Sequence, residues 1–209
     1  MRWMLALATT LTMTALASAA SAGDVSVLLR TPQGAPIEDA VVTVAAAHTG
    51  PIRFAWPYVM AQQGMMFDPF VLVVPVGAEV SFPNKDPFRH HVYSFSKART
   101  FELKLYPRGA APVVKFDKPG VVLLGCNIHD SMISFIDVVE TPWAAKTDAQ
   151  GRAVIHGVPE GVQAVTVWRP YLHAPGNALT EKVGVPKEGV AALTLTGEVR
   201  TPPMRHAMY

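Results

Sequence analysis

The chain has 209 residues, half of them hydrophobic, with 18 basic and 16 acidic residues and a single cysteine. So small a net charge argues against a nucleic acid or an anionic membrane as the partner. The length allows one large or two small domains. The 18 prolines and 15 glycines, scattered among short apolar runs, are typical of many short strands and turns.

Residues 1–22 are predicted to be a secretory signal peptide. Arg2 gives the positive start, the apolar run that follows is too short to span a bilayer, and small residues before Gly23 offer a cleavage site. Cleavage after Ala22 is preferred, with cleavage after Ala19 as the alternative. The mature protein is therefore expected in an oxidising compartment, the periplasm, and no later apolar run reaches the length of a membrane-spanning helix.

Residues 23–57 are predicted to form the first part of a host β-sandwich. Val25, Val27 and Leu29 alternate with other residues, a Pro-Gln-Gly turn follows, and residues 40–46 form a second run rich in β-branched residues. No helical period appears in this stretch. Residues 47–57 are expected to be a connection.

Residues 58–141 are predicted to form a second unit of short strands. Apolar or alternating runs recur at 71–81, 91–96, 101–106, 111–116, 121–126 and 133–140, each separated by turn residues. This spacing favours a β-sandwich. The turn with Pro119 and Gly120 at its tip delivers the strand that ends at Cys126.

Residues 142–198 are predicted to be the second part of the host. The strings T-D-x-x-G-R (147–152), G-V-P-x-G (157–161) and V-x-V-W (165–168) resemble the second half of carboxypeptidase-regulatory-like domains, and residues 25–44 resemble the first half. The unit at 58–141 would then be inserted into a discontinuous host, with Val190 to Leu195 as a closing strand. Residues 199–209 are expected to be a mobile tail.

Three sulfur and nitrogen side chains lie close together in the loop after the strand at 121–126. Cys126, His129 and Met132 offer a thiolate, an imidazole and a thioether, which form a soft ligand set. A histidine from a neighbouring strand would complete a trigonal site with two imidazoles, one thiolate and a weak axial methionine, as in blue-copper centres. A buried, inert cysteine is the alternative reading of Cys126, and zinc is the alternative metal.

The order of motifs resembles the cupredoxins, the plastocyanin and amicyanin group, including plastocyanin-like proteins of methylamine utilisation. N…D…H-x-V…F (84–95) is followed by F-x-x-P-G (116–120) and by C-x-x-H-x-x-M (126–132). The resemblance implies an all-β fold, a Greek-key β-sandwich, joined here to the second small β-sandwich. It also implies one copper ion held by His90, Cys126, His129 and Met132.

His90 and His91 compete for the upstream ligand position. Adjacent strand residues point to opposite faces, so one of the two faces the site, and alignment with the family favours His90. His91 then stands where related sequences carry asparagine. Asp130 stands where related loops often carry proline, which places a carboxylate beside His129, the expected port for electrons.

The resemblance implies a periplasmic electron carrier that is not an enzyme, with a c-type cytochrome or a dehydrogenase as its redox partner. The alternative is a periplasmic protein for copper delivery or tolerance, which the tail with Met204, His206 and Met208 would fit. A thiol enzyme with Cys126 as nucleophile and His129 as base is a third reading, and it lacks an evident orienting acid. A structural sandwich with an empty site is the fourth.

Overall fold

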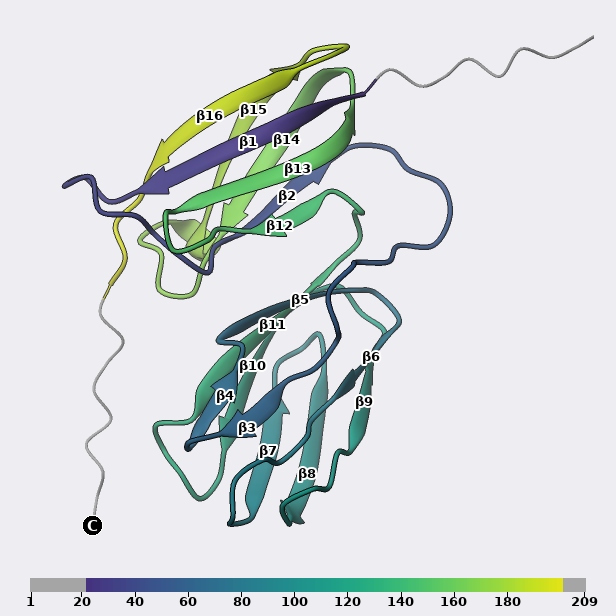
Figure 1. Ribbon diagram of the computed structural model, residues 1–209, viewed down its shortest axis with the longest axis vertical. Helices are drawn as coiled ribbons and strands as arrows, with labels where there is room; N and C mark the ends of the chain where they lie inside the picture. The colour runs from purple at the N-terminus through teal and green to yellow at the C-terminus, as the bar shows by residue number, and fades with distance from the viewer. Residues whose placement is uncertain (1–21, 201–209) are drawn as a thin grey trace, which may run out of the picture.

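The computed structural model describes residues 22–200, and these form two β-sandwiches, one above the other in Figure 1. The prediction of an all-β chain is confirmed: the described residues contain no α-helix, and their helical part is a short 3-10 turn at Pro175–Asn177. Within this part of the chain, no helix has the length and apolarity needed to cross a membrane. The predicted signal peptide, except Ala22, and the tail from residue 201 lie outside the described residues.

The host sandwich takes its strands from both ends of the described chain. Its sheets have the orders β13-β1-β16 and β12-β2-β14-β15. The strands are β1 (Ala22–Arg30), β2 (Val41–Ala45), β12 (Ala144–Lys146), β13 (Arg152–Pro159), β14 (Gly161–Trp168), β15 (Ala178–Val185) and β16 (Val190–Thr196). In β1 the alternation seen in the sequence buries Val25, Val27 and Leu29 completely between the two sheets.

The insert sandwich is formed by the strands between β2 and β12. Its main sheet has the order β5-β11-β10-β7-β8, and the pairs β3-β4 and β6-β9 cover one face of it. The strands are β3 (Ala61–Gln63), β4 (Met66–Asp68), β5 (Val71–Pro75), β6 (Ala78–Ser81), β7 (His90–Phe95), β8 (Thr100–Tyr106), β9 (Val113–Phe116), β10 (Gly120–Cys126) and β11 (Ile133–Val139). Large side chains such as Phe82, Phe116 and Ile136 fill the space between the layers.

A third apolar cluster joins the two sandwiches. Phe135 of β11 packs against Trp168 and Tyr171 of the host, with ring centroids 5.9 and 6.1 Å apart. Val71 and Val73 of β5 and Val41 of β2 belong to the same cluster. The main sheet of the insert therefore has an inner face toward its own core and an outer face that meets the host.

Two segments differ from the expectations. Strand β15 was not predicted, and it pairs with β14 along its whole length. Val199 and Arg200, placed in the predicted tail, are held to the host, because Val199 bridges Leu172 and the Arg200 amide donates to the Tyr171 carbonyl over 2.9 Å.

Candidate metal site

Cys126 is the last residue of β10 and lies on the inner face of the main sheet. Strand alternation buries Val122, Leu124 and Cys126 together, and the cysteine is 4% exposed. The antiparallel register places Cys126 opposite Val92 of β7. The thiol is free and lies at the end of the core nearest the loop between β10 and β11.

The loop at 127–132 folds back on itself and brings two more side chains to the thiol. The Cys126 amide donates to the Met132 carbonyl over 3.3 Å, and the Met132 amide donates to the His129 carbonyl over 3.0 Å. These bonds close a tight turn. As a result, the three predicted ligands of this loop share one end of the sandwich.

His90, and not His91, faces the thiol. His90, Val92 and Ser94 form the buried side of β7, while His91 lies on the outer face. The His91 Nε2 atom lies 3.0 Å from Glu102 Oε1, without the alignment of a hydrogen bond. The register that alternation and the family pattern favoured for this strand is therefore the one that the structure has.

Cys126, His90 and His129 bring three donor atoms together. The Cys126 Sγ atom lies 3.7 Å from His90 Nδ1 and 3.6 Å from His129 Nδ1, and the three donor atoms lie within 4.8 Å of one another. Donors roughly 2.0–2.3 Å from a shared metal ion, at trigonal or tetrahedral angles, stand about 3.6–3.8 Å apart. The spacing and the donor types therefore fit a bound metal ion.

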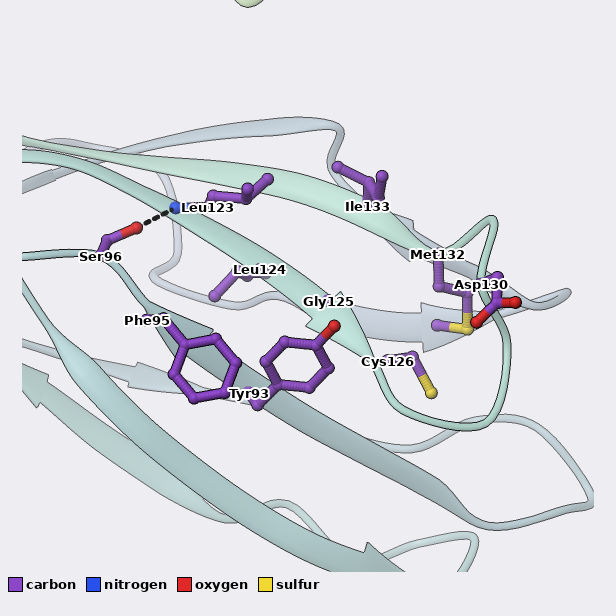
Figure 2. A pocket seen from close by; sticks show the side chains of 10 residues that line it. All are labelled: Tyr93, Phe95, Ser96, Leu123, Leu124, Gly125, Cys126, Asp130, Met132 and Ile133. Atoms are coloured by element: carbon purple, nitrogen blue, oxygen red, sulfur yellow. Dashed lines mark hydrogen bonds between the residues drawn. The ribbon is translucent and has the colours of Figure 1, made fainter. Parts of the chain in front are cut away.

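Met132 is the fourth predicted ligand, and it is 1% exposed. Its side chain lines the same hollow as Cys126, and Figure 2 shows the two sulfur atoms on the same side of the loop. A thioether in this place can act as a weak axial donor, and it also fills the core.

Asp86 belongs to the site, although the sequence analysis gave it no role beyond its place in the N…D…H-x-V…F pattern. Its carboxylate lies 2.8 Å from His90 Nε2 and accepts hydrogen bonds from the Gly64 and Met65 amides over 2.6 and 3.1 Å. Burial would raise the pKa of Asp86, but the hydrogen bonds from His90, Met65 and Gly64 hold it below its usual value. The ionised carboxylate keeps the Nε2 proton in place, which leaves Nδ1 free to bind a metal. The sequence did contain a signal for this role, because Asp86 stands four residues before His90.

His129 is partly exposed and packs against two other rings. Its ring centroid lies 5.4 Å from that of Phe88 and 5.0 Å from that of His90. Desolvation, with a smaller contribution from the charge of His90, lowers the pKa of His129. A lowered pKa favours the neutral imidazole, which is the form that binds metals.

Strand alternation and the host sandwich decide which apolar side chains lie near the site. Leu123 and Ile128 are largely exposed, and Phe135 faces the host on the other side of the sheet. The buried apolar neighbours on the inner face are Val92 and Leu124. Because β11 is buried on both faces, its sequence carries no alternation that would assign Phe135 to one side of the sheet.

Other candidate ligands lie elsewhere. Met65 and Met66 are 51% and 65% exposed. His156 and His173 are exposed in the host, where they pair with Asp24 and Glu198. Met204, His206 and Met208 lie outside the described residues.

The structure also bears on the thiol-enzyme reading. Asp86, His90 and Cys126 are connected in the order of a catalytic acid, base and nucleophile. However, a thiol that is 4% exposed offers a substrate little access, and this reading leaves the second imidazole at 3.6 Å without a role. A metal site uses both imidazoles and the carboxylate.

No protein-family model and no curated protein sequence matches the chain. Among solved structures, it is similar to a purple cupredoxin from Nitrosopumilus maritimus, with 19% identity over 39% of this chain and 98% of that one, at a TM-score of 0.35. A reduced amicyanin variant is 20% identical over 47% of this chain and 98% of that one, at a TM-score of 0.37.

A copper-containing nitrite reductase from Thermus scotoductus is 26% identical, with a TM-score of 0.39, over 55% of this chain and 28% of that one. All three TM-scores are below 0.5.

Proposed function

We propose that this chain is a periplasmic type 1 copper protein that carries single electrons between redox partners and catalyses no reaction of its own. The observation that carries the proposal is the placement of one thiol and two imidazole Nδ1 atoms at the mutual spacing of metal ligands. His90, Cys126 and His129 would hold the ion, with Met132 as the axial donor. Bound copper would supply a one-electron couple between Cu(II) and Cu(I).

The residues around the site suit electron transfer. One thiolate and two neutral imidazoles leave a net charge of +1 with Cu(II) and zero with Cu(I), and the buried side chains of Val92 and Leu124 disfavour the charged state. Asp86 fixes the orientation and tautomer of His90, so this ligand needs little rearrangement when an electron arrives. His129 is partly exposed, so an electron could pass through its ring between the site and a partner at the surface.

Adding Cu(II) to the purified protein tests the proposal. An intense visible thiolate-to-copper band is expected, and it should be lost in Cys126→Ser, whose circular dichroism should match that of the parent because serine is nearly isosteric. A colourless protein that still binds Zn²⁺ would instead indicate a zinc site. Unchanged colour in Cys126→Ser would remove the cysteine from the site.

Copper delivery or tolerance is the second candidate, and the exposed Met65 and Met66 favour it. Thioethers are soft ligands that suit Cu(I), and this pair lies at the turn that Asp86 holds beside His90. This reading expects a second equivalent of Cu(I) to bind, and Met65→Leu/Met66→Leu should remove it. For a carrier, we expect one equivalent and a rapid reaction with a c-type cytochrome or a dehydrogenase.

A further inference from the structure

Strand β5 is an edge strand of the insert's main sheet and lies below the host in Figure 1. Among the described strands it pairs with β11 alone, in parallel. The Phe135 amide donates to the Phe70 carbonyl at one end of this pair, and the Val76 amide donates to β11 at the other end. Every second residue of a strand bonds to a given neighbour, so the even-numbered residues of β5 face β11. The backbone groups of Val71 and Val73 therefore point to the opposite, free edge.

Three backbone groups on this free edge have no partner among the described residues. The Val73 carbonyl accepts a hydrogen bond from Trp56 Nε1 over 2.8 Å. The Val73 amide and both backbone groups of Val71 make no hydrogen bond within the described part of the chain. The two valines are 1% and 0% exposed. Buried backbone groups are nearly always paired, because leaving them unpaired is costly, so a molecule that pairs with them recovers this cost.

A hollow of about 480 Å³ lies along the free edge, in the joint between the two sandwiches. Residues 71–73 line it from the insert, and Ala145 and Lys146 of β12 line it from the host. Lys146 is the one charged residue among the described residues of this lining, and its Nζ atom lies 2.7 Å from Asp39 Oδ1. The ammonium group is thus already paired with a carboxylate. The joint hollow therefore suits an uncharged, apolar occupant.

The free groups of the edge have the pattern that an extended peptide complements. They follow one another as donor, acceptor and donor: the Val71 amide, the Val71 carbonyl and the Val73 amide. A peptide strand beside this edge, in either direction, supplies two carbonyl groups from residues two apart and one amide between them. Peptides that add a strand to an open sheet edge gain affinity from such main-chain bonds and specificity from pockets for their side chains.

We propose that the free edge of β5 is a docking site for an extended, uncharged segment of a partner polypeptide, which adds a short strand to the insert's main sheet. The inference goes beyond the proposed function and does not depend on a bound metal, because β11 separates β5 from the strand that ends at Cys126. A segment in the joint hollow also contacts β12, so its binding would hold the two sandwiches together.

Binding is tested on the whole protein without added metal, with the peptide acetyl-Thr-Val-Thr-Val-Thr-amide as the probe. In an NMR titration, the amide resonances of Val71 and Val73 and the indole resonance of Trp56 should shift. The amides of Leu72 and Val74, which already bond to β11, should change less. No shift of the Val71 and Val73 amides at millimolar peptide would overturn the proposal.

A series of probe peptides, each methylated at one backbone nitrogen, tests the strand pairing and leaves the protein unchanged. Methylation of a nitrogen that faces β5 removes a donor and should weaken binding at least severalfold. Methylation of the nitrogens between should have little effect, so the loss should alternate along the peptide. An equal loss at every position, or none at any, would overturn the pairing.

A substitution in the hollow tests its place. Val59 lines the joint hollow, so Val59→Trp should block the peptide, while Val162→Trp, at an exposed valine of the host, is the matched control and should not. Decanoate that binds beside Lys146 in a protein that takes no peptide would identify a small-molecule site and overturn the proposal. A dimer of the parent that Val59→Trp dissolves would also overturn it, because the edge would then pair with a second copy.

Discussion

At the scale of single residues, the site depends on one carboxylate that touches no metal donor directly. Asp86 joins the ring of His90 to the turn at Gly64 and Met65, so one side chain sets the position of a ligand and of a loop. The Asn84 side chain in turn accepts from the Asp86 amide over 2.9 Å and donates to the Phe88 carbonyl over 2.8 Å. These bonds link the β3–β4 turn, the loop at 84–88 and His90.

Asp86→Asn should weaken copper binding by roughly 10- to 100-fold, because the neutral amide no longer stabilises the Nε2 proton of His90. The measurement is a competition titration with a Cu(I) chelator. Asp117→Asn, an exposed acid outside the site, is the matched control and should keep the parent affinity. Equal affinities in the parent and both variants would show that Asp86 serves the turn alone.

The two adjacent histidines should respond differently to substitution. His90→Ala removes a donor atom and should abolish or strongly change the visible band. His91→Ala changes a ring on the outer face and should leave a coloured protein. Visible spectra of both variants decide the matter, and the reverse result would mean that the strand register is wrong by one residue.

Met132 is tested through the reduction potential. Met132→Leu removes a weak donor to Cu(II), so the potential should rise and the colour should stay. Met132→Gln supplies an oxygen donor, so the potential should fall. The leucine change keeps the volume, so the free energy of unfolding should fall by less than about 1.5 kcal/mol. Equal potentials in all three proteins, measured by voltammetry, would make Met132 a core residue only.

At the scale of elements, β7 and β10 approach each other closely near the site. Gly125 has no Cβ, and the phenol end of Tyr93 occupies the space where one would be. The glycine thus lets an aromatic ring lie flat on the strand that ends at the cysteine. Glycine is required at position 125 because there is no room for a Cβ atom, and not because the backbone has an unusual conformation.

Gly125→Ala should therefore lower the free energy of unfolding by about 1 to 3 kcal/mol, because Tyr93 must move away. Gly184→Ala on β15, where nothing lies within 4 Å of the added atom, is the matched control and should have no such cost. In the background of Tyr93→Ala, the cost of Gly125→Ala should largely disappear. Chemical denaturation of the four proteins measures this coupling, and a cost that persists without the tyrosine would refute the contact.

Some elements could be predicted from the sequence and others could not. Cys126, His129 and Met132 are close in sequence, so their spacing alone predicts a shared loop. Alternation says that only one of His90 and His91 faces the site, and the family pattern favours His90. Asp86 was missed because its role depends on a loop conformation that pattern reasoning does not give. Strand β15 was missed because Thr180, Glu181 and Lys182 interrupt its apolar residues. The side of the sheet on which the Phe135 ring lies could not be predicted, because it depends on contacts with the host sandwich.

At the scale of the whole molecule, the joint between the sandwiches contains an acid. Asp137 lies on the outer face of β11, opposite Val73 and Val121, whose side chains belong to the joint. Burial raises the pKa of Asp137 to about 6 from a usual value of 3.8. The folded protein therefore carries an unfavourable buried charge above pH 6.

The contribution of Asp137 to stability should rise as the pH falls from 7 to 4, because the folded state takes up a proton at Asp137 before the unfolded state does. The contribution of this one group is about 2 to 3 kcal/mol. Asp137→Asn should stabilise the protein by a similar amount at pH 7 and by little at pH 4, as measured by denaturation at both values. Glu160→Gln is the control, and an Asp137→Asn effect that is equal at both values would refute the raised pKa.

The pairing of β1 with β16 has a consequence for the order of events during synthesis. Asp24 pairs with Val190 and Ser26 with Val154. Strand β1 therefore cannot pair until β13 and β16 have emerged, more than a hundred residues later. The insert between β2 and β12 is complete well before those partners appear, and its contacts are shorter in sequence. Domains fold as units once their residues are available. In a chain that emerges N-terminus first, the insert sandwich is therefore expected to fold before the host sandwich. The proposed metal site would then be formed while the host sandwich is still incomplete.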